Sequence, residues 1–189
     1  MRAEIAVFVA TSLDGYIARS DGSMDWLNEA NRGVPRGEDC GYAAFVATVD
    51  VLVMGRASFE QVLTFESWPY DGLKVIVLTH RALTLPAHLS EMVTASSETP
   101  ATLVQRLSAQ GAKRIYVDGG KTIQAFLAAD LIDNLTLTVV PVLIGTGRPL
   151  FGPARGDGWL VLESVKTYAF GFVQSRYRVR RSSQAPQGG

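Results

Sequence analysis

Four short segments of the sequence combine glycine with charged or hydroxyl side chains, and each directly follows an apolar run that predicts a strand. They are residues 54–60, 78–81, 117–122 and 141–150. Glycine lets the backbone approach a ligand closely, and arginine, lysine or the first N–H groups of a helix bind phosphate oxygens. These residues therefore favour the binding of a phosphorylated ligand at the ends of several strands.

Segment 117–122 has the clearest phosphate-binding pattern, because a strand meets two glycines and then a helix. Its end matches a Walker A loop, but Ile115 stands where that motif requires its upstream glycine. A Rossmann fingerprint also fails, since no third glycine follows at the right spacing. Two interpretations stay open: a tight strand-to-helix turn, or a phosphate cradle made by Gly119, Gly120, Lys121 and Thr122.

Segment 54–60 repeats the arrangement of a strand, a glycine and a helix. Arg56 adds a planar, permanently charged fork suited to a phosphate group, and Ser58 is expected to cap the helix. Taken alone, the segment favours a surface arginine beside an ordinary capped helix.

The other two segments are less specific. A hydroxyl, an imidazole and a guanidinium gather at Thr79, His80 and Arg81, which suits a ribose-bearing or charged ligand but is more often a polar loop. The turn Gly145-Thr146-Gly147 either approaches a ligand or reverses the chain, and Pro149 excludes a dinucleotide fingerprint there.

The elements that position these segments follow from the hydrophobic pattern. Apolar runs predict strands at 5–10, 50–54, 74–79, 91–94 and 114–117. Helical spacing predicts helices at 39–48, 58–63, 100–110 and 121–129. Strands then follow strands at 134–140, 159–167 and 172–180, with the last two flanking Phe170-Gly171. This order predicts an α/β fold: a mostly parallel sheet with helices on both faces and a C-terminal antiparallel hairpin. In such sheets ligands bind at the carboxyl ends of the strands.

The composition of the chain argues against several classes of function. The chain has 189 residues, 18 Lys+Arg against 18 Asp+Glu, one cysteine (Cys40) and two histidines (His80 and His88). One domain is expected over residues 1–181, followed by a disordered tail at 182–189. The zero net charge, the lack of a long apolar run and the few Cys and His argue against nucleic-acid, membrane and metal binding. The first apolar run is short and lacks a cleavage pattern, so a cytoplasmic protein is expected.

The last predicted strand carries Arg176, Arg178 and Arg180 on one face. We interpret them as protecting a solvated edge strand, in preference to an anion-binding or nucleic-acid-binding stripe.

Taken together, the segments of this sequence resemble those of the dihydrofolate-reductase-like superfamily. They resemble more closely the stand-alone proteins similar to the reductase domain of riboflavin biosynthesis (the RibD C-terminal domain). The resemblance extends from Ile5 to Val179, and the order and spacing of the matching segments make it specific. It rests on residues 12–18 (Ser-Leu-Asp-Gly-Tyr-Ile-Ala), on segments 54–60 and 117–120, on Phe126-Leu127 and on residues 141–147.

The resemblance implies a three-layer sandwich and an NADPH-dependent reductase of a small heterocyclic substrate, similar to the 5-amino-6-(5-phosphoribosylamino)uracil reductase domain. The alternatives are dihydrofolate reductase activity and a non-catalytic NADP-binding protein of the same fold. By position, segment 54–60 resembles the first cofactor loop, with Arg56 near the 2′-phosphate. Segment 78–81 resembles the adenosine-side loop, and Gly119 to Thr122 the pyrophosphate loop. The implied cofactor-binding set is Ala10, Ile17, Gly55, Arg56, Ala57, Ser58, Thr79, His80, Arg81, Gly119, Gly120, Lys121, Thr122 and Ile123, with Ala10, Ile17 and Ile123 near the nicotinamide.

The resemblance leaves the proton donor open. Hydride transfer to a C=N or C=O bond needs a proton at the other atom. Dihydrofolate reductases use an acidic residue on an early helix, and Asp25 is the acidic residue nearest to that position in this sequence. Asp14 matches the riboflavin-type pattern, although the aspartate of an Asp-Gly pair more often orients a turn. A phosphorylated substrate would need a second anion site, for which Arg32, Arg148 and Arg155 are candidates.

The family resemblance also bears on assembly. Family members often form dimers, which predicts a homodimer through the apolar residues Leu135, Leu137, Val139 and Phe172. No Cys/His set for a fused zinc deaminase is present, so the reductase-like domain is expected to stand alone.

Overall fold

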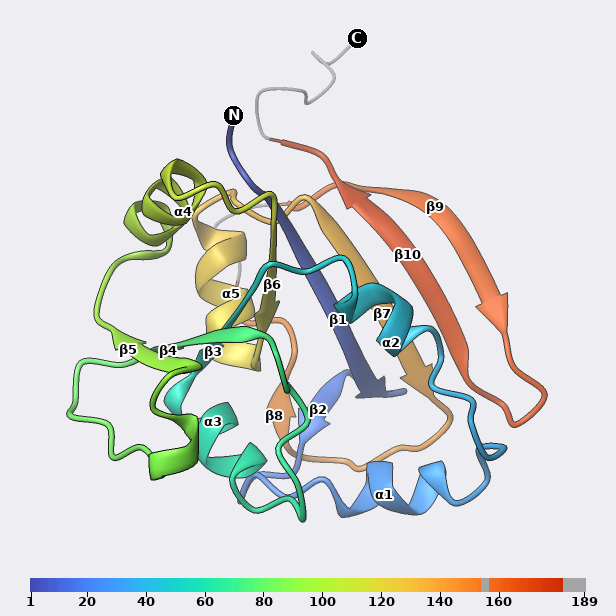
Figure 1. Cartoon of the computed structure of the whole chain (residues 1–189). Coiled ribbons are helices and arrows are strands. Elements are labelled where there is room, and N and C mark those ends of the chain that lie inside the picture. The colour runs from blue at the N-terminus through green and yellow to red at the C-terminus, as the bar shows by residue number, and fades with distance from the viewer. Residues whose placement is uncertain (154–156, 182–189) are drawn as a thin grey trace, which may run out of the picture.

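The computed structural model describes residues 1–153 and 157–181, and in this part of the chain the main sheet has eight strands (Figure 1). Their order across the sheet is β5-β4-β3-β6-β1-β7-β10-β9. Neighbouring strands are parallel from β5 to β7, and β10 and β9 continue the sheet antiparallel. The strands are β1 (Glu4–Ser12), β3 (Val51–Gly55), β4 (Lys74–Leu78), β5 (Val93–Ser96), β6 (Arg114–Asp118), β7 (Asn134–Val140), β9 (Leu160–Thr167) and β10 (Val173–Val179).

Helices on both faces complete the three-layer sandwich, so the predicted fold class is confirmed. On one face α4 (Pro100–Ala109) and α5 (Gly120–Ala128) pack against β1, β3 and β6 in a first core that includes Ile5, Val53 and Phe126. On the other face α2 (Tyr42–Val46) and α3 (Arg56–Val62) cover a second core, with a 3-10 turn, η1 (Ala87–Leu89), beside them. Within the described residues, no helix has the length and apolarity needed to cross a bilayer.

Two features near the carboxyl edge of the sheet have no counterpart in the predicted elements. One is helix α1 (Asp25–Asn31), which buries Trp26 against the tip of the β9–β10 hairpin in a third cluster with Val140 and Phe172. The other is a two-stranded sheet of β2 (Tyr16–Ala18) and β8 (Arg148–Pro149). Their sequences are short and only partly apolar, so their stability comes from packing against other segments.

Several sequence-based expectations are wrong in detail. Helix α2 spans only 42–46 of the predicted 39–48, because Asp39 accepts hydrogen bonds from the N–H groups of Gly41 and Ala43 in a turn before the helix. Ser58 does not cap α3, since the helix begins at Arg56 with Gly55 as its N-cap. Strand β10 is not an edge strand: it lies between β7 and β9, and Arg176 and Arg178 both pair with Glu163.

The predicted dimer surface is also partly wrong, because Leu135 and Phe172 are buried in the monomer, in the first core and the third cluster. Leu137 and Val139 are half-buried. The predicted tail at 182–189 and the candidate anion ligand Arg155 lie outside the described residues.

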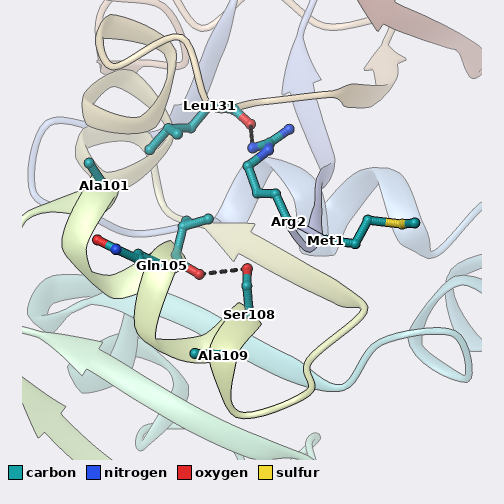
Figure 2. A pocket seen from close by; sticks show the side chains of 8 residues that line it. Met1, Arg2, Ala101, Gln105, Ser108, Ala109 and Leu131 are labelled. Carbon is teal, nitrogen blue, oxygen red and sulfur yellow. Dashed lines mark hydrogen bonds between the residues drawn. The ribbon is translucent and has the colours of Figure 1, made fainter.

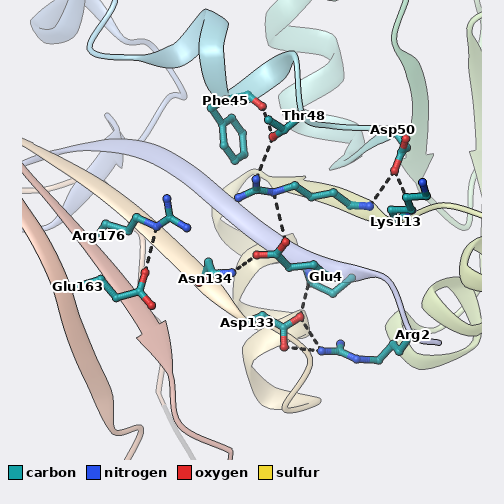
Figure 3. Close-up of polar contacts among 12 residues, drawn as sticks. Arg2, Glu4, Phe45, Thr48, Asp50, Lys113, Asp133, Asn134, Glu163 and Arg176 are labelled. Carbon is teal, nitrogen blue, oxygen red and sulfur yellow. Dashed lines mark hydrogen bonds and ion pairs between the residues drawn. The ribbon is translucent and has the colours of Figure 1, made fainter.

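Three carboxylates, those of Glu4, Asp50 and Asp133, hold the amino-terminal edge of the sheet, opposite the predicted ligand-binding edge (Figure 3). Asp133 forms ion pairs with Arg2 and Arg181 and accepts the Ile5 N–H at 2.8 Å, so it joins both chain ends to the start of β7.

We expect Asp133→Asn to lower the free energy of unfolding by about 2 kcal/mol, because charge-assisted hydrogen bonds are lost on a partly buried residue. Urea unfolding would measure the loss, with Glu91→Gln, a change at an exposed acid, as the control. A loss no larger than that of the control would contradict the role of Asp133.

A cavity of about 410 Å³ lies near this same edge, between α4 and the start of the chain (Figure 2). Its walls include Ala101, Val104 and Leu131, and its one charged residue, Arg2, already donates to the Leu131 carbonyl and pairs with Asp133. Because its charge is engaged and it lies away from the carboxyl edge, this cavity is not the candidate site.

Candidate active site

The loops that follow β3 and β6 interlock at the carboxyl edge of the sheet. A Cβ atom added to Gly119 would lie 2.3 Å from Ser58 Oγ, and one added to Gly55 would lie 2.9 Å from Thr122 Oγ1. Both distances are shorter than real Cβ contacts, so a side chain at either position would force the neighbouring hydroxyl to move. The two predicted phosphate segments therefore meet at one place, and the starts of α3 and α5 lie side by side.

The start of α5 has the features of an anion-binding site. Its N-cap, Gly119, has φ 87°, and no side chain caps the first turn of this nine-residue helix. Uncapped N–H groups at the positive end of a helix dipole favour a phosphate oxygen. Gly120 packs against Ile17 and the Pro149 carbonyl, which brings the β2–β8 sheet to the same loop. The residues present therefore fit the pyrophosphate of a dinucleotide.

Arg56 links this site to the loop after β4. Its Nε pairs with Glu60 Oε1 at 2.6 Å, and its Nη1 donates to the Ala82 carbonyl at 2.9 Å. Beside it, Thr79 Oγ1 accepts the Arg81 N–H at 3.1 Å in a tight turn. Three of the predicted cofactor segments are thus brought together, with Ala57, His80 and Arg81 exposed at their surface.

Not every predicted cofactor residue has a side chain at this surface. Ile123 is fully buried in the first core, and its N–H donates to the Gly119 carbonyl, so its side chain anchors α5. Ala10 is half-buried on β1, opposite Thr138 of β7.

The two aspartates predicted as catalytic are both ionised and engaged. The carboxylate of Asp14 accepts the N–H groups of Ile144 and Gly145, the latter at 2.8 Å. A hydrogen bond from Ser12, helped by these backbone donors, lowers the pKa of Asp14. Asp25 pairs with Arg19 at 2.6 Å, and this hydrogen bond lowers the pKa of Asp25. A proton donor needs a raised pKa, so both side chains are better suited to holding loops in place.

A third aspartate, Asp118, has the opposite electrostatics. It ends β6 beside Gly119, and burial raises the pKa of its carboxyl, although the Gly119 N–H opposes the shift. The charge of Asp118 is felt by Tyr42, Tyr70 and Tyr116. Burial, with Asp118 adding to it, raises the pKa of Tyr42 to about 12, and the same two causes also raise the pKa of Tyr70 and Tyr116. A half-buried carboxyl with a raised pKa, close to three neutral phenols, fits a general acid.

The strand register places Asp118 beside the predicted nicotinamide environment. Tyr116 pairs with Ala6, so Tyr116 and Asp118 share the face of the sheet that carries Phe8 and Ala10. Asp118 is not among the residues predicted for the site, because a carboxyl between a strand and two glycines gives no sign in the sequence of how far the fold buries it. The three tyrosines were also missed, since they lie on three separate segments at residues 42, 70 and 116.

Two of the three candidates for a second anion site, Arg32 and Arg148, lie in the described residues, and each has a contact within the chain. Arg32 pairs with Glu29 on the exposed surface of α1, and Arg148 lies over Gly22 with its Nε near the Ser20 carbonyl. The two arginines are on different elements, and no contact between them is seen. In residues 1–153 and 157–181, no group of three or more His, Cys, Asp or Glu side chains is arranged to hold a metal ion.

Comparison with known proteins identifies the family of the chain. A family model described as the RibD C-terminal domain matches residues 3–173. The chain belongs to the RibD C-terminal domain family. The uncharacterised Bacillus subtilis protein YwjB is 33% identical over 171 residues, which cover 89% of this chain and 94% of YwjB.

Solved structures of RibD-like proteins share the fold. A Shewanella sp. PV-4 protein, provisionally assigned to riboflavin biosynthesis, is 36% identical with a TM-score of 0.87, over 96% of this chain and 100% of that one. The Thermotoga maritima diaminohydroxyphosphoribosylaminopyrimidine deaminase/5-amino-6-(5-phosphoribosylamino)uracil reductase is 12% identical with a TM-score of 0.73. This likeness spans 95% of this chain and 57% of the Thermotoga protein, and it concerns the fold alone. The family and the fold that the sequence motifs predicted are therefore confirmed.

Proposed function

We propose that this RibD C-terminal domain protein is an NADPH-dependent reductase of a small heterocyclic substrate, of the kind named for the Thermotoga relative. The observation that carries the proposal is the juxtaposition of two features at one edge of the sheet. The interlocked glycine loops meet at the uncapped start of α5, and the adjoining residue Asp118 is a carboxyl with a raised pKa. A cytoplasmic location belongs to the same proposal.

The chain's own residues divide the work of binding. The first turn of α5, with Gly119, Gly120, Lys121 and Thr122, would hold the pyrophosphate. Arg56 would face the 2′-phosphate, and the turn at 79–81 would border the adenosine. Ala10 and Ile17 would border the nicotinamide, which supplies the hydride when NADPH is bound. Asp14 fixes the 141–147 loop at the rim through Ile144 and Gly145.

Proton delivery is assigned to Asp118. Reduction of a C=N or C=O bond adds a hydride to carbon and a proton to the heteroatom. Loss of solvation keeps the Asp118 carboxyl protonated to higher pH than an exposed aspartate, which suits it to give that proton and be reprotonated from solvent. The ionised Asp14 and Asp25 lack this property.

An assay of NADPH oxidation would identify the substrate. The panel would contain a phosphoribosylaminopyrimidine, its unphosphorylated riboside, dihydrofolate and simple carbonyl compounds. Turnover of either pyrimidine supports the proposal. Turnover of dihydrofolate alone would support dihydrofolate reductase activity, and tight NADPH binding without any turnover would indicate a non-catalytic NADP-binding protein.

Cofactor choice gives a direct prediction for Arg56. Saturating NADPH should raise the melting temperature of the wild-type protein more than NADH does, because only NADPH has a phosphate for the guanidinium. In Arg56→Ala, NADPH affinity should fall about 10-fold to 100-fold, as expected for lost charge-assisted hydrogen bonds, while NADH affinity changes little. Arg180→Ala, at an exposed arginine beyond the end of β10, is the control. Equal stabilisation of the wild type by both nucleotides would refute the 2′-phosphate assignment.

A further inference from the structure

Arg148, the first residue of β8, has a guanidinium that is held in place but forms no ion pair in residues 1–153 and 157–181. Its Nε donates to the Ser20 carbonyl at 3.4 Å, and in the same residues Nη1 and Nη2 have no hydrogen-bond partner. Three other arginines near the carboxyl edge, Arg19, Arg32 and Arg56, each pair with an acid. The charge of Arg148 is therefore available to an anion from outside the chain.

The turn at residues 19–23 holds this guanidinium. A Cβ atom added to Gly22 would lie 2.9 Å from Nη2 and 3.0 Å from both Cζ and Nη1, so the flat face of the guanidinium rests against this glycine. The Gly22 N–H donates to the Arg19 carbonyl, and the Arg19 N–H donates to the Ser23 carbonyl, each at 2.9 Å. Because these bonds close the backbone of the turn, packing against Gly22 fixes the guanidinium, and its two terminal amino groups remain available as a planar fork.

Strand β8 places Arg148 beside the start of α5. The next residue, Pro149, has its carbonyl against Gly120, since a Cβ atom added to Gly120 would lie 3.1 Å from that oxygen. The same carbonyl accepts Gln124 Nε2 at 3.1 Å, which binds β8 to the first turns of α5. On β2, which pairs with β8, Ile17 also contacts Gly120. Arg148 is therefore one residue away from a direct contact with the loop that would hold the pyrophosphate.

The charge of a dinucleotide pyrophosphate calls for more than the start of a helix. The group carries two negative charges, whereas the N-terminus of a helix is equivalent to about half a positive charge. Lys121 is exposed on the first turn of α5 and offers a single flexible ammonium, and Arg56 is already held by Glu60 and the Ala82 carbonyl. An arginine fork can donate to two phosphate oxygens at once, which a lysine cannot do in a fixed geometry. Arg148 has both this chemistry and the position for it.

We propose that Arg148, together with the first turn of α5, binds the pyrophosphate of the dinucleotide, and that Gly22 positions its guanidinium for this contact. The inference rests on the proposed function. It assigns Arg148 to the cofactor, whereas the sequence placed this residue among the candidates for a substrate phosphate. The cofactor is favoured because β8 and β2 both contact Gly120, in the loop that would hold the pyrophosphate. A guanidinium that is already oriented loses little conformational freedom when the ligand binds.

Calorimetric titration of the full chain with three nucleotides tests the assignment without any measurement of turnover. NADPH has the pyrophosphate and the 2′-phosphate, NADH has the pyrophosphate alone, and adenosine 2′-monophosphate has the 2′-phosphate alone. Arg148→Ala should weaken the binding of NADPH and NADH alike, by about 10-fold to 100-fold, because charge-assisted hydrogen bonds to the pyrophosphate are lost. Its affinity for adenosine 2′-monophosphate should be unchanged. Arg56→Ala should show the complementary pattern, with NADPH and adenosine 2′-monophosphate weakened and NADH unchanged.

Three further variants separate the fork of Arg148 from its charge and from the turn. Arg148→Lys keeps the charge but loses the planar fork, so it should recover only part of the affinity. Arg180→Ala removes another exposed arginine and should leave the affinity for all three nucleotides unchanged. In Gly22→Ala the added Cβ displaces the guanidinium, so NADPH and NADH should bind more weakly, with no further loss when Gly22→Ala is combined with Arg148→Ala. The melting temperature without nucleotide checks that each variant is folded.

The possible failures distinguish this inference from the proposed function. A wild type that binds neither NADPH nor NADH would refute both. Tight binding of both dinucleotides that Arg148→Ala leaves unchanged would refute the role of Arg148 alone, and weaker binding of a phosphoribosylaminopyrimidine by that variant would then assign Arg148 to the substrate. Loss of NADPH and adenosine 2′-monophosphate with NADH retained would place Arg148 at the 2′-phosphate. An equal loss of all three nucleotides would indicate a general effect of charge and would also overturn the assignment.

Discussion

Replacing Asp118 by asparagine is expected to lower kcat/KM for hydride transfer by about 100-fold or more, which is the usual contribution of a general acid. The asparagine keeps the shape of the side chain and its place beside Gly119, but it has no acidic proton to give. The activity of the wild-type protein should also fall as pH rises above the raised pKa of Asp118, because the carboxyl is then ionised. In Asp118→Asn this alkaline decline should disappear. The pH profile therefore separates proton donation from a purely structural role.

The same substitution should stabilise the fold at neutral pH. Burial raises the pKa of Asp118 above its ordinary value of 3.8, so the folded state binds this proton more tightly than the unfolded chain does. Folding stability consequently falls as pH rises from 3.8 through the raised pKa, and the loss is complete above it. Asp118→Asn removes that penalty. Its melting temperature should exceed that of the wild type at pH 7 to 8 and approach it towards pH 3.8.

The competing donors give opposite expectations. Asp14 and Asp25 have lowered pKa values and hold loops, so asparagine at either position should act through loop position and leave the alkaline limb of the profile in place. Asp71→Asn, at an exposed position, controls for the loss of a charge alone. If Asp14→Asn or Asp25→Asn abolishes the alkaline limb while Asp118→Asn retains it, the assignment of Asp118 is wrong.

Gly119→Ala should destabilise the protein by about 2 to 6 kcal/mol. A residue with a Cβ costs roughly 1 to 3 kcal/mol in a sparsely populated backbone region, and Gly119 has φ 87° with ψ 132°. Overpacking against Ser58 Oγ, 2.3 Å from the new Cβ, adds roughly 1 to 3 kcal/mol. Urea unfolding would measure the total, and the dinucleotide should bind more weakly because the two loops are forced apart.

Two further variants separate these causes. Gly111 has a similar φ of 93° but nothing within 4 Å of its added Cβ, so Gly111→Ala reports the backbone cost alone. In the double variant Ser58→Ala/Gly119→Ala the clash with Oγ is gone, and the remaining Ser58 Cβ contact at 3.4 Å is ordinary. The double variant should recover the part of the loss that exceeds Gly111→Ala. If Gly119→Ala costs no more than Gly111→Ala, the loops do not interlock.

Much of the fold could be predicted because it is encoded locally. Strand β7 has the predicted bounds, Asn134–Val140, and α4 begins after Thr99, whose Oγ1 accepts the Thr102 N–H. The helix is followed by Gly111 with positive φ, as its sequence position indicated. These signals are apolar periodicity, helix caps and turn glycines, and each acts within a few residues. They can therefore be recognised in a short segment of the sequence without the rest of the chain.

The site could be predicted only in part. Strand-to-helix glycines pointed to the loops after β3 and β6, but Ser58 was expected to cap α3 and lies instead against Gly119. Ile123 was expected at the cofactor and is buried in the core. The contacts of Ser58 and the burial of Ile123 depend on segments that come from other parts of the chain. Local sequence patterns carry no information about those segments.

The amino-acid sequence by itself determined the α/β class and the mostly parallel arrangement of the sheet, and it indicated the edge at which ligands are expected to bind. Short-range patterns and chain connectivity govern these features. Only the tertiary structure decided which carboxyl has a raised pKa and which surface is open. Asp14, Asp25 and Asp118 are chemically the same in the sequence. Burial raises the pKa of one, and hydrogen bonds lower the pKa of the other two. The exposed side of β9 that carries Leu162 and Val165 likewise appears only when the register of the hairpin and the extent of α4 and α5 are known.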